Sequence, residues 1–155
     1  MDTPSLFNEF KLNILLGSTS GIGKSFAEYL AEKGLHLLVI SRSEDKLTEQ
    51  KKELETKFHV AVNYIAYDFG VPGEVRKKFY SALEVELKKM HEDGGIGLLI
   101  NNVGVANEIP KTIEEFTDQE VEDMIQCNVF SIVYMTRYLA CLVVCLLVCS
   151  MCSLI

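Results

Sequence analysis

The sequence predicts a single α/β domain built around a parallel sheet, and two observations support this fold class. Short apolar runs alternate with longer segments whose apolar residues recur at helical spacing, and a glycine-rich turn separates the first run from the first such segment. Strict alternation of strand and helix favours parallel strands joined by right-handed crossovers, with helices on both faces of the sheet. No repeat, low-complexity segment or linker divides the 155 residues.

The apolar pattern predicts each element in turn. Strands are expected over residues 12–16, 37–40, 60–66 and 96–100, and helices over 22–33, 44–58 and 75–90. Gly34 is the expected stop of the first helix, and Ser43 is the expected cap of the second. The capping box Thr117-Asp-Gln-Glu120 predicts a long final helix that continues through Asn128.

Composition and charge exclude several classes of protein. Apolar residues make up 48% of the chain and charged residues 24%, which is ordinary for a globular domain. The net charge of −7 argues against a nucleic-acid-binding surface, because such a surface needs clustered Lys and Arg. All five cysteines lie at or after Cys127, so the sequence predicts no disulfide framework and no metal site. Residues 1–11 lack the apolar core of a signal peptide, which predicts an intracellular, reducing environment.

The glycine-rich turn between the first strand and the first helix predicts a dinucleotide site. Glycines let the backbone turn sharply and approach a pyrophosphate, whose charge meets the free N–H groups at the start of the helix. The alternative is a tight turn with no ligand, but the strand, turn and helix are all in register. The expected binding residues of the turn are Gly17, Ser18, Ser20, Gly21, Ile22 and Gly23.

The end of the second strand predicts which cofactor binds. A carboxylate there would accept hydrogen bonds from a ribose 2′-hydroxyl, whereas a cation would pair with a 2′-phosphate. This chain has Arg42 at that place, and its guanidinium fork matches phosphate oxygens. The sequence therefore favours NADP(H); the alternative is a surface ion pair of Arg42 with Glu44 or Asp45.

The third and fourth strands also end in candidate binding residues. Asp68 and Phe69 follow the third strand, where the carboxylate could accept from an adenine amino group; a turn Asp before Gly70 is the alternative. The fourth strand is followed by four candidate binding residues, Asn101, Asn102, Val103 and Gly104. The asparagines are expected to join neighbouring strand ends, and Gly104 is expected to leave room for the cofactor. Ligands bind at the carboxyl ends of strands in open α/β sheets, so the agreement of all four junctions strengthens each prediction.

Taken as a set, these motifs resemble the short-chain dehydrogenase/reductase family over roughly residues 10–139. The segments Leu38–Ser43 and Gly97–Gly104 look most like the branch of very-long-chain 3-oxoacyl-CoA reductases and 17-beta-hydroxysteroid dehydrogenases. The resemblance implies a partial Rossmann fold with strand order 3-2-1-4 and a long C-terminal helix. It also implies NADP(H) as cofactor, a 3-oxoacyl-CoA or keto-steroid as substrate, and a place at the endoplasmic reticulum membrane, or otherwise in the cytoplasm. Asn128 matches the fourth catalytic residue of the family, an asparagine that helps to position a proton-relay water.

The resemblance stops before the rest of the family's catalytic residues. A Ser and a Tyr-x-x-x-Lys pair normally follow the long helix, and no such segment follows Leu139. Tyr29 and Lys33 have the right spacing, but their helix leads away from the nicotinamide end. Two hypotheses remain open: a chain of NADPH-dependent reductase lineage, or a catalytically inactive, truncated or membrane-associated cofactor-binding fragment.

The last 17 residues differ in character from the rest. Residues 1–138 form the predicted dinucleotide-binding domain, and residues 139–155 form an uncharged, apolar, cysteine-rich tail. The tail has three interpretations: an extension of the long helix, a marginal membrane anchor with cysteines open to palmitoylation, or sequence foreign to the family. With the fourth strand at a sheet edge, we also expect the isolated chain to associate.

Overall fold

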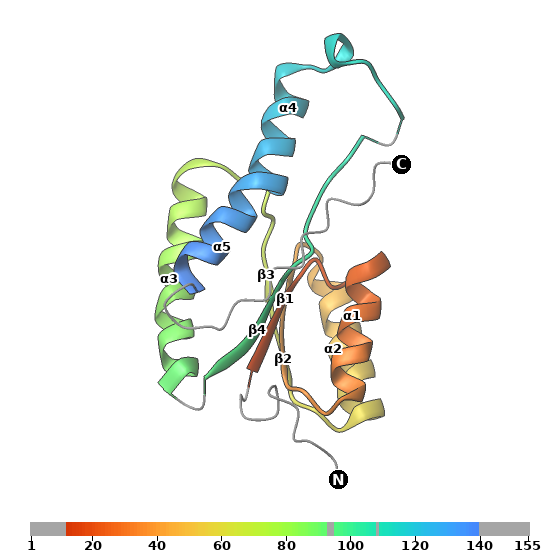
Figure 1. Cartoon of the computed structure of the whole chain (residues 1–155), viewed down its shortest axis with the longest axis vertical. Helices are drawn as coiled ribbons and strands as arrows, with labels where there is room; N and C mark the ends of the chain where they lie inside the picture. The colour runs from red at the N-terminus through yellow and green to blue at the C-terminus, as the bar shows by residue number, and fades with distance from the viewer. Residues whose placement is uncertain (1–11, 93–94, 108, 140–155) are drawn as a thin grey trace.

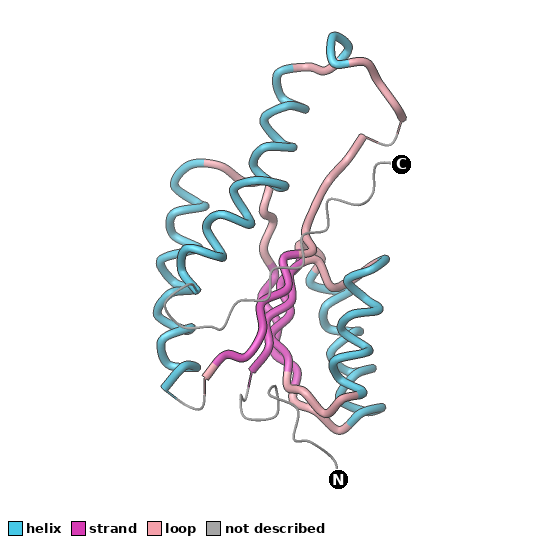
Figure 2. Tube along the Cα trace, in the orientation of Figure 1, coloured by secondary structure: helices cyan, strands magenta, loops and turns pink. Residues whose placement is uncertain are grey.

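The structure, a computed structural model, describes residues 12–92, 95–107 and 109–139. Helices α1 (Gly21–Glu32) and α2 (Glu44–Phe58) cover one face of a central sheet (Figure 1). Helix α3 (Gly73–Glu92) lies with α5 (Ser131–Leu139) over the other face, and the tube view shows the same three layers (Figure 2). This arrangement confirms the α/β prediction with helices on both faces.

Four parallel strands form the sheet in the predicted order. They are β1 (Leu12–Leu16), β2 (Leu37–Ser41), β3 (Val62–Ala66) and β4 (Ile96–Asn101), arranged β3-β2-β1-β4. Every residue of β1 and β2 is buried, which explains why these runs are apolar without alternation. Strand β3 begins two residues later than predicted: the Ala61 carbonyl accepts from the Leu37 N–H of β2 (3.0 Å), but the Ala61 N–H donates to Nδ1 of the His36 side chain (3.0 Å).

The helix boundaries follow the predicted signals with one correction. Gly34 adopts a positive φ of 79° just after α1, as expected for a glycine that ends a helix. Ser43 stands at the N-cap of α2 with an extended backbone, but its side chain makes no capping hydrogen bond. The predicted position of the cap is therefore confirmed, and so are Glu44 and Asp45 in the first turn, whose charges suit the helix dipole; only the capping hydrogen bond of the Ser43 side chain is missing.

The predicted long helix is present, but a wider turn interrupts it. After a short 3₁₀ turn, η2 (Ile113–Glu115), helix α4 (Asp118–Ile125) begins at the predicted capping box. The Glu120 N–H donates to Oγ1 of Thr117 (3.2 Å), and the Thr117 N–H donates to Oε2 of Glu120 (2.9 Å). A π-helical segment, η3 (Gln126–Phe130), then joins α4 to α5.

Two apolar clusters, one on each face of the sheet, form the core. Residues of α1 and α2 such as Ala27, Leu47 and Leu54 pack on one face. Residues of α3 and α5 such as Leu87 and Met135 pack on the other. Of the predicted tail, residues 140–155 lie outside the described residues. Within the described ranges, no helix combines the length and the apolar character that crossing a membrane requires.

Candidate dinucleotide-binding site

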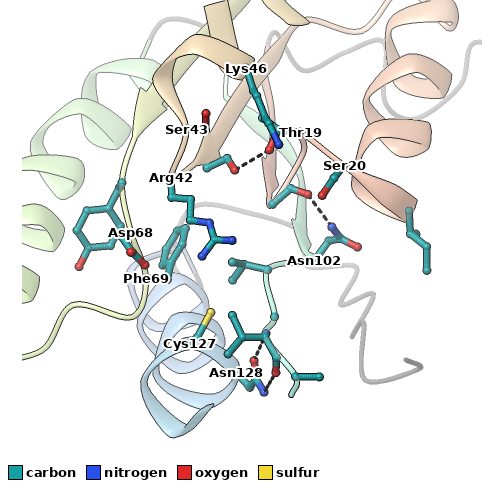
Figure 3. A pocket seen from close by; sticks show the side chains of 18 of the residues that line it. Thr19, Ser20, Arg42, Ser43, Lys46, Asp68, Phe69, Asn102, Cys127 and Asn128 are labelled. Atoms are coloured by element: carbon teal, nitrogen blue, oxygen red, sulfur yellow. Dashed lines mark hydrogen bonds between the residues drawn. The ribbon is translucent and has the colours of Figure 1, made fainter. Parts of the chain in front are cut away.

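The carboxyl ends of the four strands meet around a cavity of about 370 Å³ (Figure 3). Segments that follow β1, β2, β3 and β4 all contribute to its wall, together with η3 and the start of α5. The predicted site residues that line the cavity are Gly17, Ser20, Ile22, Arg42, Asp68, Phe69, Asn102, Val103, Gly104 and Asn128. The topology thus brings together ten residues from five segments that are far apart in the sequence.

The glycine turn is packed so tightly that larger residues do not fit. A Cβ on Gly23 would lie 2.0 Å from the carbonyl oxygen of Gly17 and 2.3 Å from Nδ2 of Asn102. That amide donates to the Gly17 oxygen (2.9 Å), so it ties the segment after β4 to the segment after β1. Gly21 has a φ of +50° with nothing within 4 Å of its Cβ position, which leaves the turn open on that side.

Four of the predicted site residues do not reach the cavity. Gly21 and Gly23 shape the turn without lining the cavity, and Ser18 is fully buried beneath it. The Ser18 hydroxyl donates to Oε1 of Gln50 (2.8 Å), while Nε2 of Gln50 donates to the Ser18 carbonyl (2.7 Å). Asn101 is buried, and in the described part of the chain neither of its amide atoms finds a hydrogen-bond partner. Of the two asparagines expected to join strand ends, Asn102 does so and Asn101 does not.

Two cations stand at the end of β2. Arg42 projects toward the middle of the cavity, and Lys46, one turn into α2, also lines it (Figure 3). Among the described residues neither forms an ion pair, so the expected alternative pairing of Arg42 with Glu44 or Asp45 is absent there. Sequence reasoning missed Lys46, which lies in the first turn of the helix that follows Arg42.

The segments after β3 supply a carboxylate and an aromatic wall. One carboxylate oxygen of Asp68 accepts from the Gly70 N–H (2.9 Å). Asp68 is therefore a turn residue, as the alternative prediction had it, and it also lines the cavity. Phe69 is buried and meets Tyr67 edge-on, with ring centroids 5.1 Å apart. Burial raises the pKa of Tyr67, whose hydroxyl has no hydrogen-bond partner in the described residues.

The π-helical segment contributes Cys127 and Asn128. The Asn128 side chain pairs with the backbone of Val105: its Oδ1 accepts from the Val105 N–H (2.7 Å), and its Nδ2 donates to the Val105 carbonyl (2.8 Å). Cys127 was not predicted to contribute. Burial raises the pKa of its thiol to about 11, so the group is neutral at physiological pH.

The cavity wall includes further residues that were not predicted to belong to the site. They are Thr19, Ser41, Ser43, Lys46, Tyr67, Val105, Ala106, Cys127 and Ile132. Thr19 and Ser41 lie within hydrogen-bond distance through their hydroxyl oxygens (3.0 Å), which joins the glycine turn to the end of β2. Tyr29 and Lys33 take no part in the cavity; on α1 the Lys33 ammonium lies 5.2 Å from the centroid of the Tyr29 ring.

In α/β proteins that bind dinucleotides, the first parallel strand likewise enters a glycine turn beside a cavity at the strand ends. The model of the short chain dehydrogenase family matches residues 11–144, and the chain belongs to this family. It is 37% identical over 126 residues to the very-long-chain 3-oxoacyl-CoA reductase of Rattus norvegicus and 36% identical to that of Homo sapiens. Both alignments cover 80% of this chain and 38% of the relative, so the predicted resemblance to this branch is confirmed.

Solved structures agree with the fold. The L-sorbose reductase of Gluconobacter frateurii, in complex with NADPH and L-sorbose, superposes with a TM-score of 0.70 at 30% identity, covering 84% of this chain and 46% of that one. A short-chain dehydrogenase of Sphingobium yanoikuyae, in complex with NADPH, gives 0.71 at 27% identity, covering 84% and 47%. The chain therefore spans less than half the length of these relatives.

Proposed function

We propose that this chain is an NADP(H)-binding unit of a carbonyl reductase. The observation that carries the proposal is the position of Arg42 and Lys46: two cations without ion-pair partners among the described residues share one cavity with the glycine turn. A dianionic 2′-phosphate at the end of β2 would satisfy both. The NADPH complexes of two similar structures support this choice over NAD(H).

The remaining residues of the cavity suit the other parts of the dinucleotide. The open side of Gly21, with the free N–H groups at the start of α1, suits a pyrophosphate. The Asp68 oxygen that is not bonded to Gly70 suits an adenine amino group. When bound, the cofactor would supply a hydride at its nicotinamide ring, and the family resemblance supports Asn128 as the proton-relay asparagine.

The similarity to very-long-chain 3-oxoacyl-CoA reductases extends the proposal to substrate, location and domain organisation. We assign residues 1–138 to the dinucleotide-binding domain, with a 3-oxoacyl-CoA or keto-steroid as the substrate class of the lineage. The endoplasmic reticulum membrane is the proposed location, with membrane contact through residues 139–155.

A second candidate function is cofactor binding without catalysis. Tyr67 is the one tyrosine among the described lining residues, and it is a poor proton donor because burial raises its pKa and its hydroxyl lacks a partner there. Val71, rather than a lysine, stands four residues after it. A reductase assay with NADPH and a 3-oxoacyl-CoA separates the two: turnover above the buffer rate supports the reductase, and binding without turnover supports the second candidate.

Titration of the chain with NADPH and with NADH, followed by nicotinamide fluorescence, tests the cofactor assignment. We expect tighter binding of NADPH. Because a hydrogen bond to a charged group contributes about 1.5–3 kcal/mol, Arg42→Ala should weaken NADPH binding by roughly tenfold or more and leave NADH binding unchanged. The matched control is Arg137→Ala, an exposed arginine on α5 outside the cavity. Equal affinities of the wild-type chain for the two cofactors would remove the role assigned to Arg42.

A further inference from the structure

Arg76 is a charged residue of α3 that does not line the cavity but contacts both ends of a segment that does. Its Nη1 donates to Oε1 of Gln126, the first residue of η3. Its guanidinium carbon lies 4.6 Å from the ring centroid of Phe130, the last residue of η3, and 5.1 Å from that of Tyr134 in α5. One side chain thus spans the whole π-helical segment from outside.

The π-helical turn needs such support because it is a rare backbone state. A π turn inserts one extra residue into a helix, and such turns occur mostly as single interruptions, often at functional sites. The insertion also changes which side chains of α4 face the cavity relative to those of α5. The planar fork and face of an arginine can donate to Gln126 and stack on two rings at once, which the point charge of a lysine cannot.

Between the two contacts of Arg76 lie Cys127 and Asn128, which face the cavity (Figure 3). The double hydrogen bond of Asn128 with Val105 then fixes the segment after β4. Gly104, just before Val105, also lines the cavity, and a Cβ there would lie 3.4 Å from Oδ1 of Asn128. A contiguous path therefore runs from Arg76 through η3 and Asn128 to the wall of the cavity.

We propose that Arg76 is a positioning residue: it holds η3 in its π-helical form so that Asn128 can pair with Val105 and shape the dinucleotide cavity. Its effect on cofactor binding rests on the proposed function, whereas its effect on the Asn128–Val105 pair does not. Arg76 does not line the cavity, and its hydrogen bond to Gln126 and its contact with the Phe130 ring both act on η3.

The test compares Arg76→Met with the wild-type chain. Methionine keeps an unbranched, flexible stem that can still pack on the rings, but it removes the charge and the bond to Gln126. Lys78→Gln is the matched control, because Lys78 is an exposed cation on the same helix. Hydrogen exchange is measured without cofactor at the Val105 amide and at sheet amides such as those of Ile14 and Leu15. NADPH affinity is measured by fluorescence under conditions where circular dichroism shows a folded chain.

We expect Arg76→Met to accelerate exchange at Val105 by about tenfold with little change in the sheet, as for a local opening rather than global unfolding. NADPH binding should weaken by about fivefold, because a wall of the site loses its preorganisation. Lys78→Gln should change neither quantity. Equal acceleration of exchange at Val105 and in the sheet would overturn the proposal, because Arg76 would then stabilise the fold as a whole. Unchanged exchange at Val105 would also overturn it, because Arg76 would then have no effect on the Asn128–Val105 pair.

A second variant covers the case in which Arg76→Met fails to fold. Gln126→Ala removes the hydrogen bond to Arg76 and leaves the ring contacts in place, so it should accelerate Val105 exchange in the same direction by a smaller factor. Unchanged exchange at Val105 in this variant would count against the proposal. A wild-type chain that binds neither nicotinamide cofactor would refute the proposed function, while the exchange measurements would still decide the role of Arg76.

Discussion

At the scale of single residues, the glycine turn requires glycine at residue 23 because the neighbouring atoms leave no space for a side chain there. Gly23 lies against the carbonyl oxygen of Gly17, and Asn102 donates to that same oxygen from the segment after β4. The three residues interlock, so the close approach of α1 to the end of β1 depends on the absence of a side chain at residue 23. Gly21 is different, because it needs a positive φ but has open space around it.

This difference predicts unequal effects of two alanine substitutions. Gly23→Ala places a methyl group against backbone, so its free energy of unfolding should fall by about 2 kcal/mol or more, as for an overpacked site. Gly21→Ala meets only the backbone strain of a left-handed conformation, about 1 kcal/mol. Urea denaturation of both variants measures the two costs, with Gly21→Ala as the control for loss of a glycine. A smaller loss in Gly23→Ala than in Gly21→Ala would contradict the observed packing.

At the scale of elements, helix α4 is defined by its first turn. The capping box joins Thr117 and Glu120, and the side chain of Lys111 also contacts the Glu120 carboxylate. The hydrogen bond from Lys111, followed by that from the backbone of Thr117, lowers the pKa of Glu120 to about 2. The folded helix therefore favours the ionised form of the Glu120 carboxylate.

The lowered pKa of Glu120 predicts how α4 contributes to stability as a function of pH. In the unfolded chain the group titrates near its ordinary pKa of 4.5, so its stabilising contribution is complete above that pH and disappears as the pH falls toward 2. Glu120→Gln should therefore be less stable than the wild-type chain at pH 7, with a difference that narrows steadily below pH 4.5. Urea midpoints across this range test it. A difference independent of pH would mean that the charge of Glu120 has no part in the cap.

At the scale of the whole molecule, two features of the surface favour association. Strand β4 lies at one edge of the described sheet, as expected from the sequence. Along α4, η3 and α5, four apolar residues with exposed fractions of 37–53% recur every fourth position, and we call this row the stripe: Val121, Ile125, Val129 and Val133. Exposed apolar residues that gather on one surface of a soluble protein favour association.

We therefore expect the chain to self-associate as its concentration rises, and Val129→Lys with Val133→Lys to reduce this association. Both side chains are about half exposed, so the substitutions should change the free energy of unfolding by less than about 0.5 kcal/mol each. Val85→Lys is the control, because Val85 is equally exposed (53%) but lies on α3 outside the stripe. Sedimentation velocity at several concentrations provides the measurement. A monomer at every concentration, or equal behaviour of the control and the double variant, would contradict the role of the stripe.

Local patterns in the sequence were sufficient to predict most of the fold. The strands β1 and β2 are buried on both sides, so each is a plain apolar run, and Gly34 and the Thr117 box mark helix ends through interactions that reach only a few residues along the chain. The glycine turn was predictable for the same reason. The family resemblance added the strand order, which no local pattern contains.

The tertiary structure alone decided which side chains of these segments face the cavity. Ser18 lies in the turn but is turned inward because Gln50, 32 residues later, offers it both an acceptor and a donor. Lys46 joins Arg42 at the cavity, and Arg76 reaches across from α3 to the π-helical segment that presents Asn128. Such pairings depend on contacts between segments that are distant in the sequence, and the periodicity and spacing of residues along the chain do not predict these contacts. The sequence by itself therefore determined the elements and the turn, while packing between helices and strands determined the wall of the site.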